Sequence, residues 1–173
     1  LTARLPHMKA GDKILVAPKA SGFLVLAEVP AAENLWLLST GTALGPFLAI
    51  CKTEEAWGRF KNIVLVHAVR QAEELSYHDQ VEAIAAQRGS AFSFVPFVSR
   101  EDTSHAIKGR VPAAIEQGVL QSRTGVELSP EKSQVMICGN PEMVKDTQAI
   151  LEARGFRRHK RREPGHIHVE TYW

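Results

Sequence analysis

The stretch LWLLSTGTALGPFL (residues 35–48) holds an apolar run, a turn of threonine and glycine, and a proline followed by further apolar residues. An uninterrupted apolar run is typical of a strand buried on both faces, as in a parallel sheet. Gly41 and Gly45 allow a tight turn and the close approach of a ligand to the backbone. Pro46 suits the first turn of a helix, where a missing N–H costs nothing. The stretch therefore predicts a strand, a turn and a helix N-terminus, which together can bind a phosphate.

The sequence after residue 34 alternates between short apolar runs and segments with helical spacing. Such alternation predicts an α/β domain, with a mostly parallel sheet covered by helices, over residues 31–173. Strands are expected at 35–38, 63–66, 92–98, 135–138 and 167–169, and helices at 46–51, 54–60, 75–88, 111–116 and 142–154.

The first 30 residues show a different pattern. Two short apolar runs, at 13–16 and 23–26, are separated by proline, serine and glycine, which predicts two strands joined by a loop. Two strands do not form a stable sheet alone. Residues 1–30 are therefore expected to be the end of a larger β domain, separate from the α/β domain at 31–173.

Composition narrows the classes of protein. The chain has 173 residues, of which 45% are hydrophobic and 23% charged, as in a soluble globular protein. It contains no apolar run near the roughly 20 residues that cross a bilayer and no signal peptide, so we expect a cytoplasmic protein. Cys51 and Cys138 form no CxxC pattern and are expected to be free thiols. A net charge of +2 argues against nucleic acid, and histidine spacing argues against a metal site. We expect a monomer with no membrane partner.

Parallel sheets bind ligands beyond the C-terminal ends of their strands. That rule places Thr40–Thr42, His67–Arg70, Ser99–Arg100 and Gly139–Pro141 along one rim. The turn at 40–45 is not the dinucleotide fingerprint GxGxxG, and by itself it is equally compatible with an ordinary strand-to-helix turn.

Arginine follows the second expected strand, where an NAD site would carry an acid for the ribose hydroxyls. Arg70 there suits a phosphorylated ribose or a pyrophosphate, because guanidinium binds phosphate oxygens in pairs. Arg100 and Arg110 are candidates for the same ligand. Taken singly, each of these arginines fits a solvated surface residue better than a phosphate ligand.

Six motifs follow one another along the chain: STGTALGP (39–46), VLVHAVR (64–70), VSRE (98–101), GR (109–110), CGNPEM (138–143) and YW (172–173). In this order they closely resemble the motifs of the bacterial ferredoxin (flavodoxin)–NADP+ reductases. The resemblance implies an FAD-binding antiparallel β-barrel followed by an α/β NADP domain, with FAD and NADP as cofactors and ferredoxin or flavodoxin as partner. It implies an enzyme that transfers hydride between NADPH and flavin, and single electrons between flavin and the carrier.

The resemblance also assigns residues to the flavin side of the site. Cys138 matches a cysteine beside the nicotinamide, although a buried cysteine is also a common small core residue. Tyr172 matches the aromatic stacked on the flavin, and Trp173 extends that cover, although chain ends often fray. Thr2 matches a residue that contacts the FAD pyrophosphate. Cys138 and Tyr172 are the expected catalytic residues.

On the NADP side, Thr42 matches a position that lines the nicotinamide and pyrophosphate site. Arg70 matches an arginine on the NADP phosphates, while Arg100 and Arg110 match those that hold the 2′-phosphate and adenosine end. The complete set of expected cofactor-binding residues is Thr2, Thr40, Gly41, Thr42, Arg70, Arg100, Arg110, Gly139, Asn140, Met143, Tyr172 and Trp173.

The sequence departs from the family in one respect, because the flavin motif Arg-x-Tyr-Ser is absent. Together with the start at Leu1, this predicts a C-terminal portion of a longer protein, which by itself would lack most of the flavin site. The alternatives are a reductase component for another acceptor, or a non-catalytic NADP-binding module. The basic run at 157–162 is expected either to dock an acidic electron carrier or to be a solvated connector.

Overall fold

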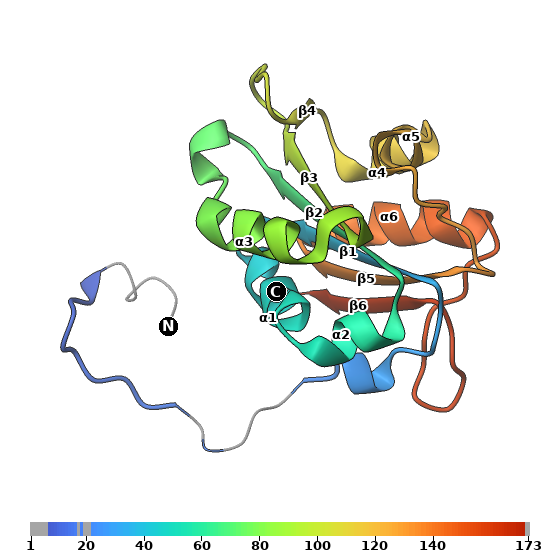
Figure 1. The fold of residues 1–173 in the computed structure, drawn as a ribbon, viewed down its shortest axis with the longest axis horizontal. Helices are drawn as coiled ribbons and strands as arrows, with labels where there is room; N and C mark the ends of the chain where they lie inside the picture. Colours follow the sequence, from blue (N-terminus) through green and yellow to red (C-terminus); the bar gives the residue numbers. More distant parts are fainter. Residues whose placement is uncertain (1–6, 17, 19–21, 172–173) are drawn as a thin grey trace.

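A computed structural model describes residues 7–16, 18 and 22–171, and among these residues the sheet has six strands. The strands lie in the order β4-β3-β2-β1-β5-β6, and every neighbouring pair is parallel (Figure 1). The expected α/β class with a parallel sheet is therefore confirmed. The strand bounds are β1 Asn34–Thr40, β2 Asn62–Val69, β3 Phe92–Val98, β4 Ile107–Lys108, β5 Ser133–Gly139 and β6 Ile167–Thr171.

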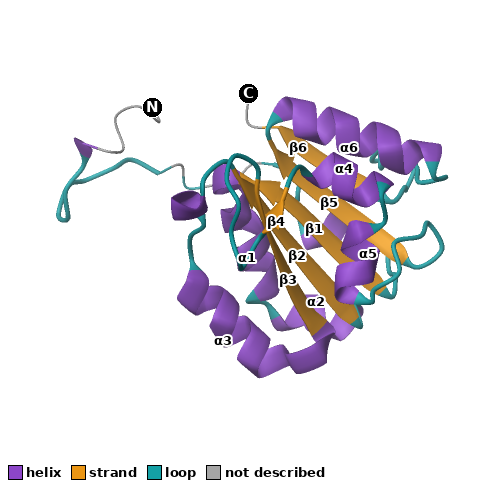
Figure 2. Cartoon of the chain, turned by 90° about the horizontal axis from the view of Figure 1, so that it is seen from above, coloured by secondary structure: helices purple, strands orange, loops and turns teal. Residues whose placement is uncertain are grey.

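Helices cover both faces of the sheet (Figure 2). One face carries α1 (Leu44–Cys51), α2 (Glu54–Arg59) and α3 (His78–Arg88). The opposite face carries α4 (Val111–Glu116), α5 (Val119–Thr124) and α6 (Pro141–Ala153). Short 3-10 turns join these elements at Leu26–Glu28, Gly41–Ala43, Ala72–Glu74 and Gly89–Ala91.

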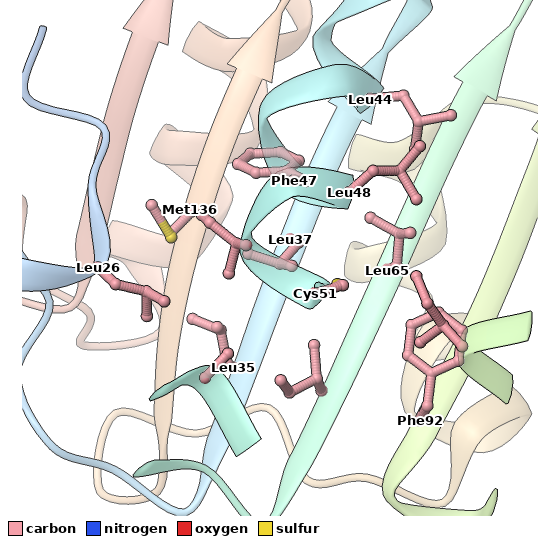
Figure 3. Close-up of a cluster of buried hydrophobic side chains, with 14 of the residues drawn as sticks. Leu26, Leu35, Leu37, Leu44, Phe47, Leu48, Cys51, Leu65, Phe92 and Met136 are labelled. Carbon is pink, nitrogen blue, oxygen red and sulfur yellow. The ribbon is translucent and has the colours of Figure 1, made fainter. Parts of the chain in front are cut away.

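The central strand β1 supplies both hydrophobic cores, because successive side chains of a strand point to opposite faces. Leu35 and Leu37 lie in the core beneath α1 and α2, whereas Trp36 and Leu38 lie in the core beneath α4 and α6. All four side chains are fully buried. Figure 3 shows the first core, in which α1 lays its apolar side chains across the strands: Leu44, Phe47, Leu48 and Cys51 over Leu35, Leu37, Leu65 and Met136.

The expected strands and helices after residue 34 are all present, with shifted ends. The expected helix at 75–88 begins only at His78, because Tyr77 has a left-handed backbone conformation (φ 61°) that an α-helix does not continue through. The sequence patterns missed α5 and also the strand β4, whose two residues are too few to display a period.

The prediction of two strands at 13–16 and 23–26 is wrong. The described residues of this part pair with no strand, and the chain extends away from the sheet (Figure 1). A strand needs a hydrogen-bonding neighbour, and Leu15 here is fully exposed. The chain joins the domain near Leu26, whose carbonyl oxygen accepts a 2.8 Å hydrogen bond from the Arg59 guanidinium. The division into domains at 1–30 and 31–173 stays a prediction.

Candidate functional site

The order of the strands sets the position of the site. From β1 the chain adds β2, β3 and β4 on one side, and then places β5 and β6 on the other. The connections that follow β1 and β5 therefore leave in opposite directions from neighbouring strands. Open parallel sheets bind ligands at such a switch point. Here it lies between the turn at 40–43 and the turn at 139–140.

These two turns are in direct contact. The backbone N–H of Asn140 donates a 2.8 Å hydrogen bond to Oγ1 of Thr40. Gly139 has φ 137°, and a Cβ atom added there would lie 2.1 Å from the same Thr40 oxygen. Glycine is required at 139 for both reasons, since a side chain would be strained and would collide. The expected residues Thr40, Gly139 and Asn140 thus form one unit.

A buried histidine supports the turn after β1. Nε2 of His67 lies 3.1 Å from the carbonyl oxygen of Gly41, and the side chain is buried. Burial lowers the pKa of His67, so the neutral ring donates its Nε2–H to this carbonyl. Gly41 itself adopts φ 54°, a conformation that suits glycine. In the segment HAVR (67–70), the first residue therefore supports the turn after β1.

The N-terminus of α6 completes this side of the site. The side-chain oxygen of Asn140 accepts hydrogen bonds from the N–H groups of Glu142 (2.9 Å) and Met143 (3.2 Å). Pro141 occupies the first turn, where it removes no helix hydrogen bond. The 13-residue helix directs the positive end of its dipole towards the switch point. An anion is favoured there.

A cleft of about 380 Å³ opens at the same rim. Arginines from the ends of β2 and β3, and from the start of α4, line one side of it, while α6 lines the other. Most of the expected cofactor-binding residues are brought together in this lining: Thr40, Gly41, Thr42, Arg70, Arg100, Arg110, Asn140 and Met143. The residues fit a phosphorylated ligand, because three arginines line one cavity.

Other expected residues lie elsewhere. Cys138 ends β5 fully buried in the core that contains Phe47, and it is not among the residues that line the cleft. Its place beside a nicotinamide stays a prediction. Thr2, Tyr172 and Trp173 lie outside the described residues, so their roles in flavin binding also stay predictions.

Three acids in the cleft lining were missed by the sequence analysis: Glu74, Glu142 and Asp146. Glu74 follows Gln71 by three residues, and the pair forms a capping box. That spacing is a recognisable signal for a helix start, although it does not indicate proximity to a ligand. The backbone N–H groups of Gln71 and Arg70, which bond to its carboxylate, lower the pKa of Glu74.

The basic run at 157–162 lies in the loop between α6 and β6. This loop precedes β6 and so lies at the rim opposite the cleft, as the loop at the start of β6 in Figure 1 shows. Within it Lys160 pairs with Glu163 at 3.2 Å. The run is therefore separated from the candidate nucleotide site by the length of the sheet.

Across the described ranges, no cluster of three His, Cys, Asp or Glu side chains has a geometry that would hold a metal ion. Among the described residues, no helix is both long enough and apolar enough to cross a membrane.

Comparison with known proteins identifies the class. Residues 37–149 match the family model described as "Oxidoreductase NAD-binding domain". The chain is similar to the flavodoxin/ferredoxin–NADP reductase of Escherichia coli, with 46% identity over the full chain and 70% of that protein. It is 34% identical to the ferredoxin–NADP reductase of Pseudomonas aeruginosa, over 98% of this chain and 69% of the relative.

A solved structure agrees with these relatives. The ferredoxin NADP+ reductase of Neisseria gonorrhoeae, with bound FAD and NADP, superposes with a TM-score of 0.91 and 35% identity. That match covers 99% of this chain and 69% of the gonococcal chain. Fold and site together define a nucleotide-binding domain of an oxidoreductase. The chain belongs to the flavodoxin/ferredoxin–NADP reductase family.

Proposed function

We propose that the cleft binds NADP(H), and that the protein transfers electrons between NADPH and ferredoxin or flavodoxin by way of FAD. Its family supports this function, since the relatives are named for that reaction and the gonococcal structure contains FAD and NADP. Within the cleft, the nicotinamide end is assigned to the switch point near Thr42. The 2′-phosphate end is assigned to Arg100 and Arg110.

The single observation that carries the proposal is the charge of the cleft. Arg70 directly follows β2, where an NAD site would place an acid, and Arg100 and Arg110 line the same cavity. A 2′-phosphate adds two negative charges that these guanidinium groups can bind. NADP is therefore favoured over NAD.

The residues of this chain act by binding and orientation. Thr40 and Asn140 hold the two turns together, His67 supports the carbonyl of Gly41, and the N-terminus of α6 favours the pyrophosphate. NADPH supplies a hydride that flavin accepts and passes on as single electrons. The protein has to align the two rings and exclude water, and no side chain is required as a general acid or base.

The finer assignments extend the same proposal. We assign a cytoplasmic, monomeric protein. Its carrier is ferredoxin, flavodoxin or both, as the names of the relatives support. The flavin contacts Thr2, Tyr172 and Trp173, and the nicotinamide contact Cys138, are assigned from the resemblance. Two alternatives remain to be tested against this: a reductase component for another acceptor, and a non-catalytic NADP-binding module.

Calorimetric titration tests the cofactor assignment. The double variant Arg100→Ala/Arg110→Ala should bind NADP+ about 100-fold more weakly, because each lost charge-assisted hydrogen bond weakens binding about tenfold. Binding of NAD+, which lacks the 2′-phosphate, should be nearly the same in the double variant as in the wild type. Arg123→Ala, an exposed arginine on α5 outside the cleft, is the control. Equal losses for both nucleotides would contradict the 2′-phosphate assignment.

Reconstitution with FAD tests the reaction class. A flavin absorbance spectrum that remains after gel filtration, and that bleaches when NADPH is added, supports a reductase. A colourless chain that still binds NADPH would instead support the non-catalytic module for this sequence. Transfer to a range of acceptor proteins then separates a ferredoxin or flavodoxin reductase from a component that serves another acceptor.

A further inference from the structure

Glu74 is one of the three acids that line the cleft. Glu74 lines the cleft together with Arg70 and Arg100, and the charges of both arginines help to lower its pKa, after the larger effect of two backbone hydrogen bonds. It is therefore negatively charged at neutral pH. A negative charge opposes the binding of a phosphate nearby, so its presence in this cleft requires another explanation.

The contacts of Glu74 supply one. A single oxygen, Oε2, accepts hydrogen bonds from the backbone N–H groups of Arg70 and Gln71, each at 2.8 Å. In return, the Gln71 side chain accepts a hydrogen bond from the Glu74 backbone, which closes the capping box. The carboxylate thus holds the backbone at the point where Arg70 leaves β2.

The neighbouring turn is tied to the same backbone. The N–H of Arg100 donates a 3.0 Å hydrogen bond to the carbonyl oxygen of Arg70. A carboxylate oxygen of Glu101 accepts a hydrogen bond from the N–H of Ala72. Both the N–H and the carbonyl of Arg70 are therefore bonded, and the turns that carry the two arginines have a fixed relation.

The side chains of Arg70 and Arg100 are exposed, and no ion pair with a carboxylate within 4 Å is found for either among the described residues. Long unpaired side chains lose rotamer freedom when they bind a ligand. Because the backbone that carries the two arginines is already fixed, only their side-chain torsions have to be ordered on binding. This is the general advantage of preorganisation.

We propose that Glu74 is a positioning residue for the 2′-phosphate end of NADP, acting through the backbone of Arg70 and not by contact with the nucleotide. The inference rests on the proposed NADP function of the cleft. It assigns two opposed effects to one side chain: its hydrogen bonds strengthen phosphate binding, while its charge weakens it. The two effects are separable, because one amide oxygen of glutamine can accept both N–H groups.

The test uses titration calorimetry with 2′-phospho-AMP and 5′-AMP as probes, on the chain itself. Glu74→Gln should bind 2′-phospho-AMP about two- to fivefold more tightly, the usual value of one exposed charge interaction. Glu74→Ala should bind it about tenfold more weakly, because the hydrogen bonds to the charged group are lost. Binding of 5′-AMP should be nearly the same in all variants.

Glu73→Ala is the matched control, since Glu73 is an exposed acid on the same turn and does not line the cleft. It should change 2′-phospho-AMP affinity less than twofold. Equal changes in Glu73→Ala and Glu74→Ala, or weaker binding by both Glu74 variants, overturn the positioning role. The glutamine variant keeps the test decisive if the alanine variant does not fold.

Nucleotide binding by the wild-type chain distinguishes a failure of this inference from a failure of the proposed NADP function. If it binds 2′-phospho-AMP no better than 5′-AMP, the proposed NADP function is overturned and the role of Glu74 with it. If it does prefer 2′-phospho-AMP but Glu74→Gln and Glu74→Ala bind like wild type, only the role of Glu74 is overturned.

Discussion

The backbone N–H of Asn140 donates a 2.8 Å hydrogen bond to the hydroxyl oxygen of Thr40, across 100 residues of sequence. The contact joins the ends of β1 and β5, whose last paired residues are Ser39 and Cys138. It therefore couples the phosphate turn after β1 to the N-terminus of α6. The two halves of the candidate site are held as one surface.

Replacing Thr40 tests this coupling. In Thr40→Val the shape is nearly kept but the N–H of Asn140 loses its acceptor, so unfolding should be easier by about 1 kcal/mol. NADP+ should also bind more weakly. Thr40→Ser keeps the hydroxyl and should stay near wild type. Urea unfolding and calorimetry give both quantities, and equal values for Val and Ser would argue against the hydrogen bond.

Two glycines with similar backbone conformations allow the effect of backbone strain to be distinguished from that of a steric clash. Gly139 has φ 137° and Gly109 has φ 131°, but only at 139 would a Cβ meet neighbouring atoms, at 2.1 Å from Thr40 Oγ1. Gly109→Ala should lower the free energy of unfolding by about 1–2 kcal/mol from backbone strain alone. Gly139→Ala should cost about 1–3 kcal/mol more, the usual effect of overpacking. Similar losses at both sites, measured by urea unfolding, would refute the close packing.

Acid should destabilise the protein through its buried histidines. Burial lowers the pKa of His168 from 6.5 to about 4, with contributions from the charges of His159 and His166. The unfolded chain therefore binds more protons, so stability is complete above about 6.5 and falls as the pH drops towards 4. Urea midpoints between pH 7 and 4 measure this loss. In His168→Gln the loss of stability between pH 7 and 4 should be smaller. If the urea midpoints of the two proteins fell in parallel with pH, the role of His168 would be contradicted.

Tyr77 offers a site for stabilisation. It is 52% exposed and has φ 61°, a left-handed conformation that costs most residues about 1–2 kcal/mol. Asparagine tolerates this conformation, so Tyr77→Asn should raise the free energy of unfolding by about 1 kcal/mol. Tyr77→Val should lower it, because β-branched residues avoid this region. A destabilised Asn variant in urea unfolding would show that the tyrosine ring has a packing role.

The thiols should be unreactive in the folded protein. Burial raises the pKa of Cys51 to about 12, and Cys138 has no exposed surface. Only the thiolate is nucleophilic, and at pH 8 roughly one Cys51 in ten thousand carries it. A chromogenic disulfide reagent should therefore titrate both thiols in urea and neither thiol without it. Rapid reaction of one native thiol would show that its site opens to solvent.

Much of the fold was predictable because the strands are buried on both faces. The apolar runs in β1, β2 and β5 are continuous, and the helical spacing in α6 is regular, so local pattern was enough. The strand β4 was not predictable, because two residues do not establish a period, and α5 was missed although α2 and α4 have the same length of six residues. The prediction of strands at 13–16 and 23–26 was wrong because a short apolar run does not supply a partner strand.

The residues of the candidate site also fall into those that the sequence predicted and those that it did not. The arginines at 70, 100 and 110 were predictable as a group, because they follow or border strand ends that parallel topology brings to one rim. Glu74 was not, since its role depends on which backbone N–H groups it reaches. The opposite location of the basic loop at 157–162 also required the direction of β6.

By itself the sequence determined the alternation of strands and helices and the position of Arg70 directly after the second strand, since both are local properties of the chain. The tertiary structure alone decided that Thr40 and Asn140 meet and that Glu74 holds the backbone of Arg70. It also decided that the basic loop faces away from the cleft. Such contacts depend on strand order and on the path of each turn, which side-chain patterns along one segment do not encode.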